Sequence, residues 1–272
     1  MIRPVLLILF SLLAGRLQAD GSPRAQLVNE IIEASGLQVQ VEQVTQLVRM
    51  GFEQSGAAEV WPASMLAQYQ GSMNRAYDHE RMLAEISVHI QTNMITPDID
   101  EVMAWLKSPL GKKISRLEAA TDADAVVNKM AIELKTLMQD TDRVARMEAL
   151  DEAMTASQHQ ITIARNTQIA ILAAKLALVH PDNRPKNEVI QEQFNHQMER
   201  LAPLIRQTTV QSFVYTYREL NPAEIEDYID FAKSRVGRAY HQAMLEGIDE
   251  ALVKANRLML ASLQKMLNVS GK

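Results

Sequence analysis

The sequence predicts an all-α fold of two related multi-helix units, which arose by tandem duplication and pack together. Three observations support this prediction. Capping residues stand directly before prolines at several points, apolar residues recur between them at helical spacing, and the second half of the chain repeats much of the first. We find no sustained alternation of polar and apolar residues that predicts a strand.

The composition limits the function before any motif is considered. The chain has 272 residues, of which 28 are basic and 33 acidic, so its formal net charge is −5. This balance argues against a protein that binds nucleic acid through a clustered basic surface. The absence of cysteine excludes disulfides, thiolate metal ligands, cysteine nucleophiles and a lipidated N-terminal cysteine.

Residues 1–19 have the three-part layout of a secretory signal peptide. Arg3 supplies the positive start, an apolar run follows over residues 5–14, and residues 17–19 predict cleavage after Ala19. The apolar run is shorter than the roughly 20 residues that span a bilayer, so an uncleaved anchor is the alternative and not the expectation. We therefore expect a mature protein that is periplasmic or secreted.

Helix starts are marked by a capping residue followed by proline. Four such pairs occur, at Ser22-Pro23, Thr96-Pro97, Ser108-Pro109 and Asn221-Pro222. The cap oxygen accepts a hydrogen bond from an unpaired backbone N–H, and proline in the first turn gives up no intrahelical bond. Glu224 completes a capping box with Asn221, and Gly36 predicts a helix end.

The apolar spacing between these marks is helical. For example, Ile99, Val102 and Leu106 fall on one face of a helix. We expect helices over residues 23–35, 38–54, 62–77, 79–94, 97–107, 109–119, 123–138, 142–179, 186–218, 222–232 and 235–267. Pro203 is expected to kink its helix, and no stretch after the signal peptide predicts a stable membrane span.

The second half of the chain repeats the first with a small, increasing offset. At an offset of 122, residues 24–50 align with residues 146–172, and at an offset of 126, residues 99–111 align with residues 225–237. Chance and the general likeness of amphipathic helices explain part of this agreement. They do not explain the shared cap-proline pairs or the shared Ser-x-x-Gly.

The repeat divides the chain into two expected units. One helical repeat unit covers residues 22–138 and the other covers residues 142–268. Two copies are too few for an open solenoid, so we expect a packed pair that shares a core or a large interface.

The most characteristic repeated block is an acidic helix that ends in an aromatic residue, followed by Ser-x-x-Gly and a basic residue. In the first half its key positions are Trp105, Ser108, Pro109, Gly111 and Lys112. In the second half they are Phe231, Ser234, Gly237 and Arg238, with Arg235 in place of the proline. With these residues the sequence resembles the bacterial family called domain of unknown function 2059. The resemblance implies an exported, all-helical protein and no particular activity.

We interpret the block first as a helix corner. The serines are expected to cap the second helix, the glycines to permit a close approach, and the aromatic residues to anchor the bend. The alternative is an anion site, in which the free N–H groups of the second helix and basic neighbours such as Lys112 and Lys113 hold a phosphate or carboxylate.

No other motif predicts chemistry. The histidines are His79, His89, His159, His180, His196 and His241, and none has the spacing of a compact metal site. The methionines are spread over both halves and predict core filling, and there is no nucleophile elbow, phosphate loop or dinucleotide motif. We therefore expect no cofactor, no metal and no catalytic residue.

These observations favour a binding, scaffolding or chaperone-like module of the bacterial envelope with a protein or peptide partner. One alternative is a hydrolase whose site is assembled from distant helices, and another is a structural protein that forms a homo-oligomer. A methionine-lined groove between the two units is expected for binding. A pocket that combines acid, histidine and serine is expected for catalysis, and a broad apolar face on a symmetric dimer for the structural role.

Overall fold

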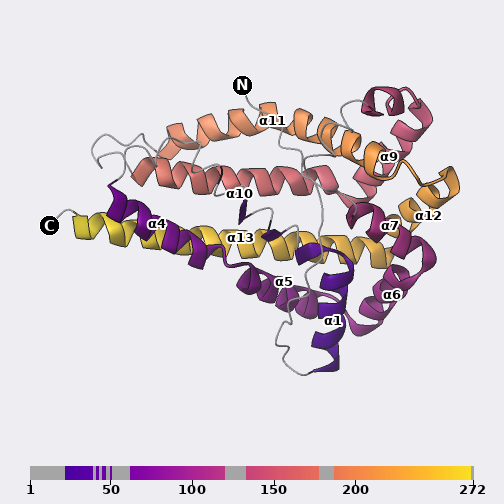
Figure 1. Ribbon diagram of the computed structural model, residues 1–272, viewed down its shortest axis with the longest axis horizontal. Coiled ribbons are helices and arrows are strands. Elements are labelled where there is room, and N and C mark those ends of the chain that lie inside the picture. Colours follow the sequence, from indigo (N-terminus) through magenta and orange to yellow (C-terminus); the bar gives the residue numbers. More distant parts are fainter. Residues whose placement is uncertain are drawn as a thin grey trace.

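The computed structural model describes residues 22–38, 41–42, 45–46, 50, 62–119, 133–177 and 187–270 (Figure 1). The predicted all-α class is confirmed for this part of the chain. The expected signal peptide, most of the helix expected over 38–54 and the start of the one expected over 123–138 lie outside it. None of the helices in the described ranges is both long and apolar enough to cross a membrane.

The helix bounds follow the sequence pattern closely. In chain order the labelled helices are α1 (Pro23–Ala34), α4 (Ala63–Ala76), α5 (His79–Asn93), α6 (Thr96–Lys107), α7 (Pro109–Ala119), α9 (Thr141–Met154), α10 (Ala156–Ala177), α11 (Asn187–Thr216), α12 (Pro222–Lys233) and α13 (Arg235–Ser270). The first five of these and α12 differ from the expected ranges by at most one residue at either end.

The predicted caps at Ser22 and Asn221 are confirmed. The Ser22 hydroxyl accepts a hydrogen bond from the Ala25 N–H at 3.1 Å. The Asn221 side chain accepts one from the Glu224 N–H at 3.0 Å, and the Glu224 carboxylate accepts one from the Asn221 N–H at 2.8 Å. These bonds satisfy backbone donors that have no intrahelical partner, so α1 and α12 begin where the sequence predicts.

The predicted cap at Thr96 is wrong. Helix α6 begins at Thr96 itself, and Ile95 occupies the N-cap position without a side-chain hydrogen bond. The Thr96 hydroxyl instead accepts a hydrogen bond from the Arg24 guanidinium of α1 at 2.9 Å. A contact between distant segments has replaced the local cap, and spacing along the chain does not reveal such a contact.

The helix expected over residues 142–179 is interrupted at Thr155. Helix α9 ends at Met154, Thr155 adopts a left-handed conformation with φ 53°, and α10 begins directly after it. A β-branched residue disfavours this conformation, so the residue type gave no sign of the break. Gly36, with φ 67°, does follow the end of α1 as predicted, and α11 continues through Pro203.

The helices pack around two hydrophobic cores, and each core draws on both halves of the chain. The first core combines α1, α4, α5 and α6 of the first half with α13 of the second. The second combines α9, α11 and α12 of the second half with Ile114 and Leu117 of α7. Helices α7 and α13 each follow a corner in their own half and pack into the core of the other. The two expected units are therefore interlocked.

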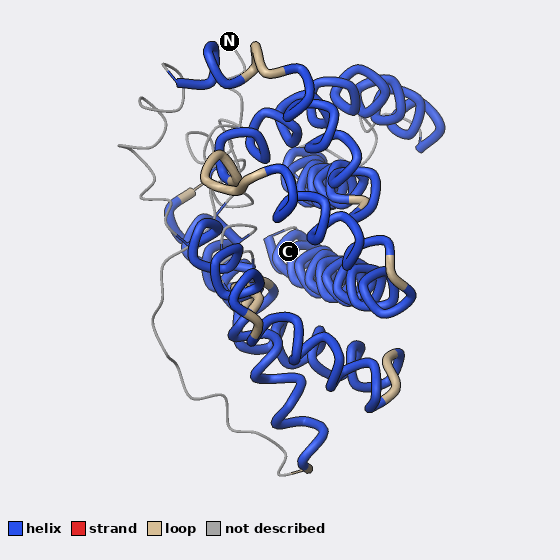
Figure 2. Tube along the Cα trace, turned by 90° about the vertical axis from the view of Figure 1, so that its right-hand side faces the viewer, coloured by secondary structure: helices blue, strands red, loops and turns tan. Residues whose placement is uncertain are grey.

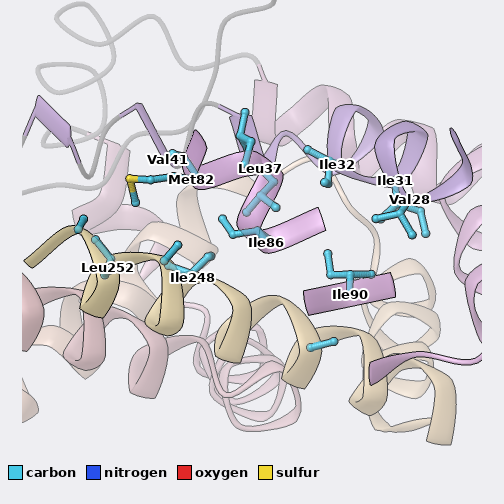
Figure 3. Packing of buried hydrophobic residues seen from close by; sticks show 14 of the residues in the cluster. Val28, Ile31, Ile32, Leu37, Val41, Met82, Ile86, Ile90, Ile248 and Leu252 are labelled. Atoms are coloured by element: carbon cyan, nitrogen blue, oxygen red, sulfur yellow. The ribbon is translucent and has the colours of Figure 1, made fainter. Parts of the chain in front are cut away.

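The first core includes side chains of α1, α5 and α13 that lie close together (Figure 3). Ile31, Ile86 and Ile90 are 0% exposed, and Leu252 of α13 is 1% exposed. Complete burial of a side chain of this size stabilises the fold by about 1.5–3 kcal/mol. This contact holds the C-terminal helix firmly to the first half.

Helix α13 forms the long axis of the molecule (Figure 1). Helices α4 and α5 pack along one side of it, and α10 packs along another with α11 lying outside α10. Figure 2 shows the same arrangement from the end of the long axis, with helices throughout the described part.

An arginine in each half binds two backbone carbonyl groups in the same way. These contacts are Arg24 to Gln91 and Met94, and Arg143 to Tyr217 and Leu220. The accepting residues of the two halves are 126 positions apart, the offset shared by the corner blocks. The sequence alignment instead pairs Arg24 with Arg146, which binds Glu226. The equivalent arginines are thus shifted by three positions, and the duplication stays a prediction.

Candidate functional site

Ser108 and Ser234 lie at bends, one between α6 and α7 and the other between α12 and α13. The Ser108 hydroxyl accepts a hydrogen bond from the Gly111 N–H at 3.0 Å, and the Ser234 hydroxyl accepts one from the Gly237 N–H at 2.9 Å. Pro109 is the first residue of α7. Each serine therefore ends one helix and caps the next.

Gly111 and Gly237 are buried against the last turn of the preceding helix. A Cβ atom at Gly111 would overlap the carbonyl oxygen of Trp105, and a Cβ atom at Gly237 would overlap that of Phe231. Both obstacles are backbone atoms, so rotation of a side chain cannot relieve the overlap. The two corners are sharp because these positions carry no side chain.

The aromatic residues of the two corners meet face to face. The rings of Trp105 and Phe231 stack with their centroids 4.3 Å apart and an interplanar angle of 6°. Trp105 also stacks on Tyr228, with a centroid distance of 6.0 Å. The structure thus brings together two blocks that the sequence identified separately.

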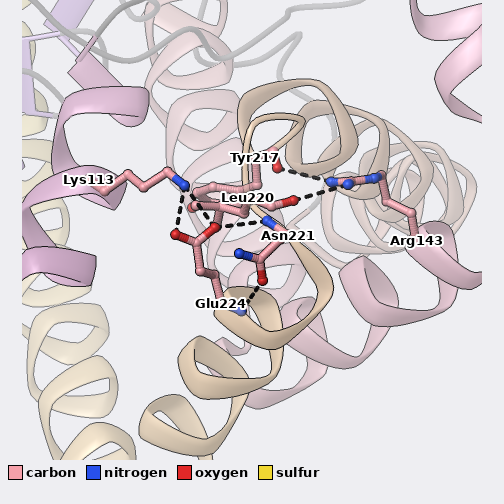
Figure 4. A network of polar contacts seen from close by, with 6 residues as sticks. All are labelled: Lys113, Arg143, Tyr217, Leu220, Asn221 and Glu224. Atoms are coloured by element: carbon pink, nitrogen blue, oxygen red, sulfur yellow. Dashed lines mark hydrogen bonds and ion pairs between the residues drawn. The ribbon is translucent and has the colours of Figure 1, made fainter.

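Each corner is joined to the acidic helix of the other half by an ion pair. The Arg235 guanidinium donates two hydrogen bonds of 2.7 Å to the Asp98 carboxylate. The Lys113 ammonium donates to both carboxylate oxygens of Glu224, also at 2.7 Å (Figure 4). The hydrogen bonds from Arg235 hold the pKa of the Asp98 carboxyl below its ordinary value, and those from Lys113 do the same for the pKa of Glu224.

These ion pairs bear on the anion interpretation of the corners. Lys113 and Arg235 already bind carboxylates of the same chain. Lys112 and Arg238 have exposed side chains. A phosphate at either corner would compete with intramolecular acids for the paired cations, so the geometry favours a joint between helices.

A carboxyl group and two tyrosines lie close to the stacked rings. The Tyr217 hydroxyl donates to Oε1 of Glu118 at 2.6 Å, and the Tyr228 hydroxyl lies 3.5 Å from the same atom. Burial raises the pKa of Glu118 to about 7, although these hydrogen bonds act in the opposite direction. Glu118 therefore lies against two tyrosines of the second core.

A cleft between α9, α10 and α11 has a volume of about 610 Å³. Its apolar lining comes from Met138, Val144 and Val210, and Asp151 and Ser157 are the buried polar residues. The exposed polar residues around it are Glu148, Glu152, Thr155, Gln158, Arg206 and Gln207. The combination of a concave apolar surface and a charged margin is typical of a binding site.

Asp151 fixes the junction between α9 and α10 at the base of the cleft. Its Oδ1 accepts a hydrogen bond from the Ser157 N–H at 2.6 Å, and its Oδ2 accepts one from the Ser157 hydroxyl at 2.5 Å. A carboxylate in this position satisfies a free N–H at the start of α10 and complements the helix dipole. Asp151 therefore serves as the cap that Thr155 does not provide.

The cleft was not predicted from the sequence. A methionine-lined groove between the two units was the feature expected of a binding protein, whereas the described lining has one methionine, Met138, and its other residues all belong to the second unit. The corner residues do not line it. A signal was present, because Glu148, Asp151, Glu152 and Thr155 follow the spacing of one helix face and form a polar stripe along α9.

The described histidines do not form a metal site. In the described ranges, no group of three or more histidine, cysteine or acidic residues is arranged to hold a metal ion. His89 of α5 instead lies between Glu246 and Glu250 of α13, at 3.4 and 3.3 Å. Burial lowers the pKa of His159 and of His241 to about 4, so both are neutral at pH 7.

The chain matches no family model, no curated protein and no solved structure. Its likeness to domain of unknown function 2059 rests on the residues of the sequence itself.

Proposed function

We propose that the chain is a binding module of the bacterial envelope that holds a peptide, or a segment of a partner protein, in the cleft between α9, α10 and α11. One observation carries this proposal. A cavity of about 610 Å³ combines apolar Val144 and Val210 with exposed charged side chains on both flanking helices. Clefts of this size and lining suit a few side chains of an extended segment.

The charges around the cleft favour an occupant with basic side chains. Glu148 and Glu152 are exposed on α9, and Arg206 is the single basic residue of the lining. A lysine of the occupant can reach these glutamates while a neighbouring apolar side chain packs on Val144 and Val210. Exposed ion pairs contribute about 0.2–1 kcal/mol each, so we expect modest affinity that falls with added salt.

The hydrolase alternative finds little support in the cleft. The Ser157 hydroxyl donates a hydrogen bond to the Asp151 carboxylate, and none of the described residues that line the cavity is a histidine. A serine nucleophile needs a base that is free to take the proton and is itself held in place. Asp151 also binds the Ser157 N–H, which supports a capping role for it.

Export, family and duplication belong to the same proposal. The layout of residues 1–19 supports cleavage after Ala19 and a periplasmic or secreted protein. The motif around Trp105 and Gly111 supports membership of domain of unknown function 2059. The matching hydrogen bonds at Ser108 and Ser234 support a tandem duplication.

Binding is tested with the mature chain, residues 20–272, and a short fluorescein-labelled peptide in which lysine and leucine alternate. We expect saturable binding by fluorescence anisotropy, weakened about tenfold by the double substitution E148Q/E152Q. The matched control is D227N/D230N, which removes two exposed carboxylates of α12 outside the cleft. Absence of binding, or equal loss of affinity in both double variants, would contradict the proposed site.

Export is tested separately by mass spectrometry of the protein recovered from a periplasmic extract. A mature N-terminus at Asp20 is expected, because cleavage is predicted after Ala19. Recovery only from the cytoplasm with Met1 intact would refute export and leave the binding test unaffected.

A further inference from the structure

Among the described side chains of helix α10 and of the first half of α11, few apolar ones are buried. Among the described side chains of α10, the buried ones are Ser157, Ile163, Asn166 and Thr167. Of these, Ile163 joins a hydrophobic core. Between Glu188 and Pro203 of α11, no described side chain is buried. Apolar burial holds most helices of a protein in place, and the described side chains of these two helices contribute little of it.

Polar side chains form hydrogen bonds across the contact between α10 and α13. The Asn166 side chain donates to Oδ1 of Asp249 at 2.6 Å, and the Asn256 side chain donates to the backbone carbonyl of Asn166 at 3.2 Å. The Tyr77 hydroxyl in turn donates to the Asn256 side chain. Water replaces hydrogen bonds of this kind at small net cost, so this contact separates more readily than an apolar one.

Several buried polar atoms on α10 and α13 have no hydrogen-bond partner among the described residues. They are Nε2 of His159, Oε1 of Gln160 and Oγ1 of Thr167 on α10, and Nε2 of His241 on α13. A buried polar atom without a hydrogen-bond partner weakens the packing of its helix. Movement of α10 away from its neighbours would let water reach the atoms that it carries.

Two weak points of the backbone lie at one end of this pair of helices. Thr155 joins α9 to α10 in a left-handed conformation that strains a β-branched residue. Pro203 has no N–H to bond to the carbonyl of Glu199, so α11 lacks one of its hydrogen bonds there. Thr155 itself and Arg206, three residues after Pro203, both line the cleft, so open space lies next to both weak points.

We propose that α10 and residues Asn187–Pro203 form an arm that swings away from α13, with Thr155 and Pro203 as hinges. Asp151 holds the first turn of α10 through Ser157, so this end acts as the pivot. Figure 1 shows the two helices lying side by side along α13, with α11 outermost. The arm is a conformational device of the fold, and it does not depend on the occupant of the cleft.

The arm is tested by hydrogen–deuterium exchange of the mature chain, read by mass spectrometry. Amides within residues 161–172 are expected to exchange at least about tenfold faster than those of α5 and α9, by separate opening of the arm. The substitution N166D places a second carboxylate against Asp249 and should speed this exchange about tenfold further. The double variant N166D/D249N restores a donor and an acceptor, and should return the rate toward that of the wild type.

A second substitution acts in the opposite direction. T167V replaces a buried hydroxyl, which has no hydrogen-bond partner among the described residues, by a methyl group of similar size, and should slow exchange of the arm several-fold. The control T92V removes a hydroxyl that donates within α5, and should leave exchange of the arm unchanged. Equal exchange of α10, α5 and α9 in the wild type, or equal acceleration of all three by N166D, would overturn the proposal.

Discussion

The indole ring of Trp105 lies parallel to the phenyl ring of Phe231, with the centroids 4.3 Å apart. The two residues are 126 positions apart in the chain and occupy equivalent places in the two corner blocks. Each ring closes the acidic helix of its own corner and packs on the other. Two local bends are thereby joined into one central joint.

Removal of both rings should show that they stabilise the fold together. We expect a coupling energy of about 0.5–1.5 kcal/mol between W105L and F231L in a double-mutant cycle. Either single substitution already removes the stacking interaction, so the second substitution costs less than it does in the wild type. The free energies of unfolding come from urea denaturation of the four proteins. Strict additivity would show that the stack contributes nothing of its own.

A methyl group at either corner glycine should destabilise the protein. G111A and G237A each place a Cβ atom against a backbone carbonyl oxygen, and we expect a loss on the order of 1–3 kcal/mol. The control is G71A in the middle of α4, where the new Cβ meets only the end of the Arg75 side chain at 3.5 Å. That change should be neutral or stabilise by about 0.5–1 kcal/mol. Similar melting temperatures for all three variants would rule out the close approach.

Ionisation of the Glu118 carboxyl group should lower the free energy of unfolding of the protein as the pH rises. Its pKa is raised from 4.5 to about 7 in the folded protein, so the unfolded chain gives up this proton at lower pH. Its contribution is therefore complete below about pH 4.5 and is lost as the pH rises toward 7. E118Q should be more stable than the wild type at pH 8, with the difference shrinking toward pH 4.5. An advantage that is independent of pH would contradict the assignment, and E101Q on the surface of α6 is the control.

His159 and His241 should make the protein sensitive to acid. Burial lowers the pKa of both from 6.5 to about 4, so the unfolded chain takes up protons first as the pH falls. Stability is then full above pH 6.5 and is lost progressively toward pH 4. The double variant H159Q/H241Q should lose less stability than the wild type between pH 7 and 4.5 in urea titrations. The control H196Q, at an exposed histidine, should lose stability with falling pH as the wild type does. The same loss in the double variant would show that His159 and His241 do not cause the acid sensitivity.

Much of the fold was predictable because its signals are local. A cap followed by proline fixes a helix start through one or two hydrogen bonds, as at Ser22 and Asn221. The Ser-x-x-Gly spacing likewise fixed the corners at Ser108 and Ser234, because the serine and the glycine bond to each other.

The remainder depends on contacts between distant segments. The hydroxyl of Thr96 accepts a hydrogen bond from Arg24 and does not cap its own helix. The break at Thr155 is stabilised by Asp151, which caps α10, and not by Thr155 itself. Helix α7 packs into the core of the second half and α13 packs into the core of the first half, and the apolar periodicity of neither helix predicts this exchange. The cleft was missed for the same reason, since α9 supplies its acids and α11 supplies Val210 and Arg206.

The most direct test of the binding proposal is to locate the lysine–leucine peptide on the mature chain by hydrogen–deuterium exchange at saturating peptide. Protection is predicted over residues 144–158 and 206–210, which include most of the cleft lining, and should be weaker in E148Q/E152Q at the same peptide concentration. Protection confined to the corners around Ser108 and Ser234, or none anywhere, would contradict the account.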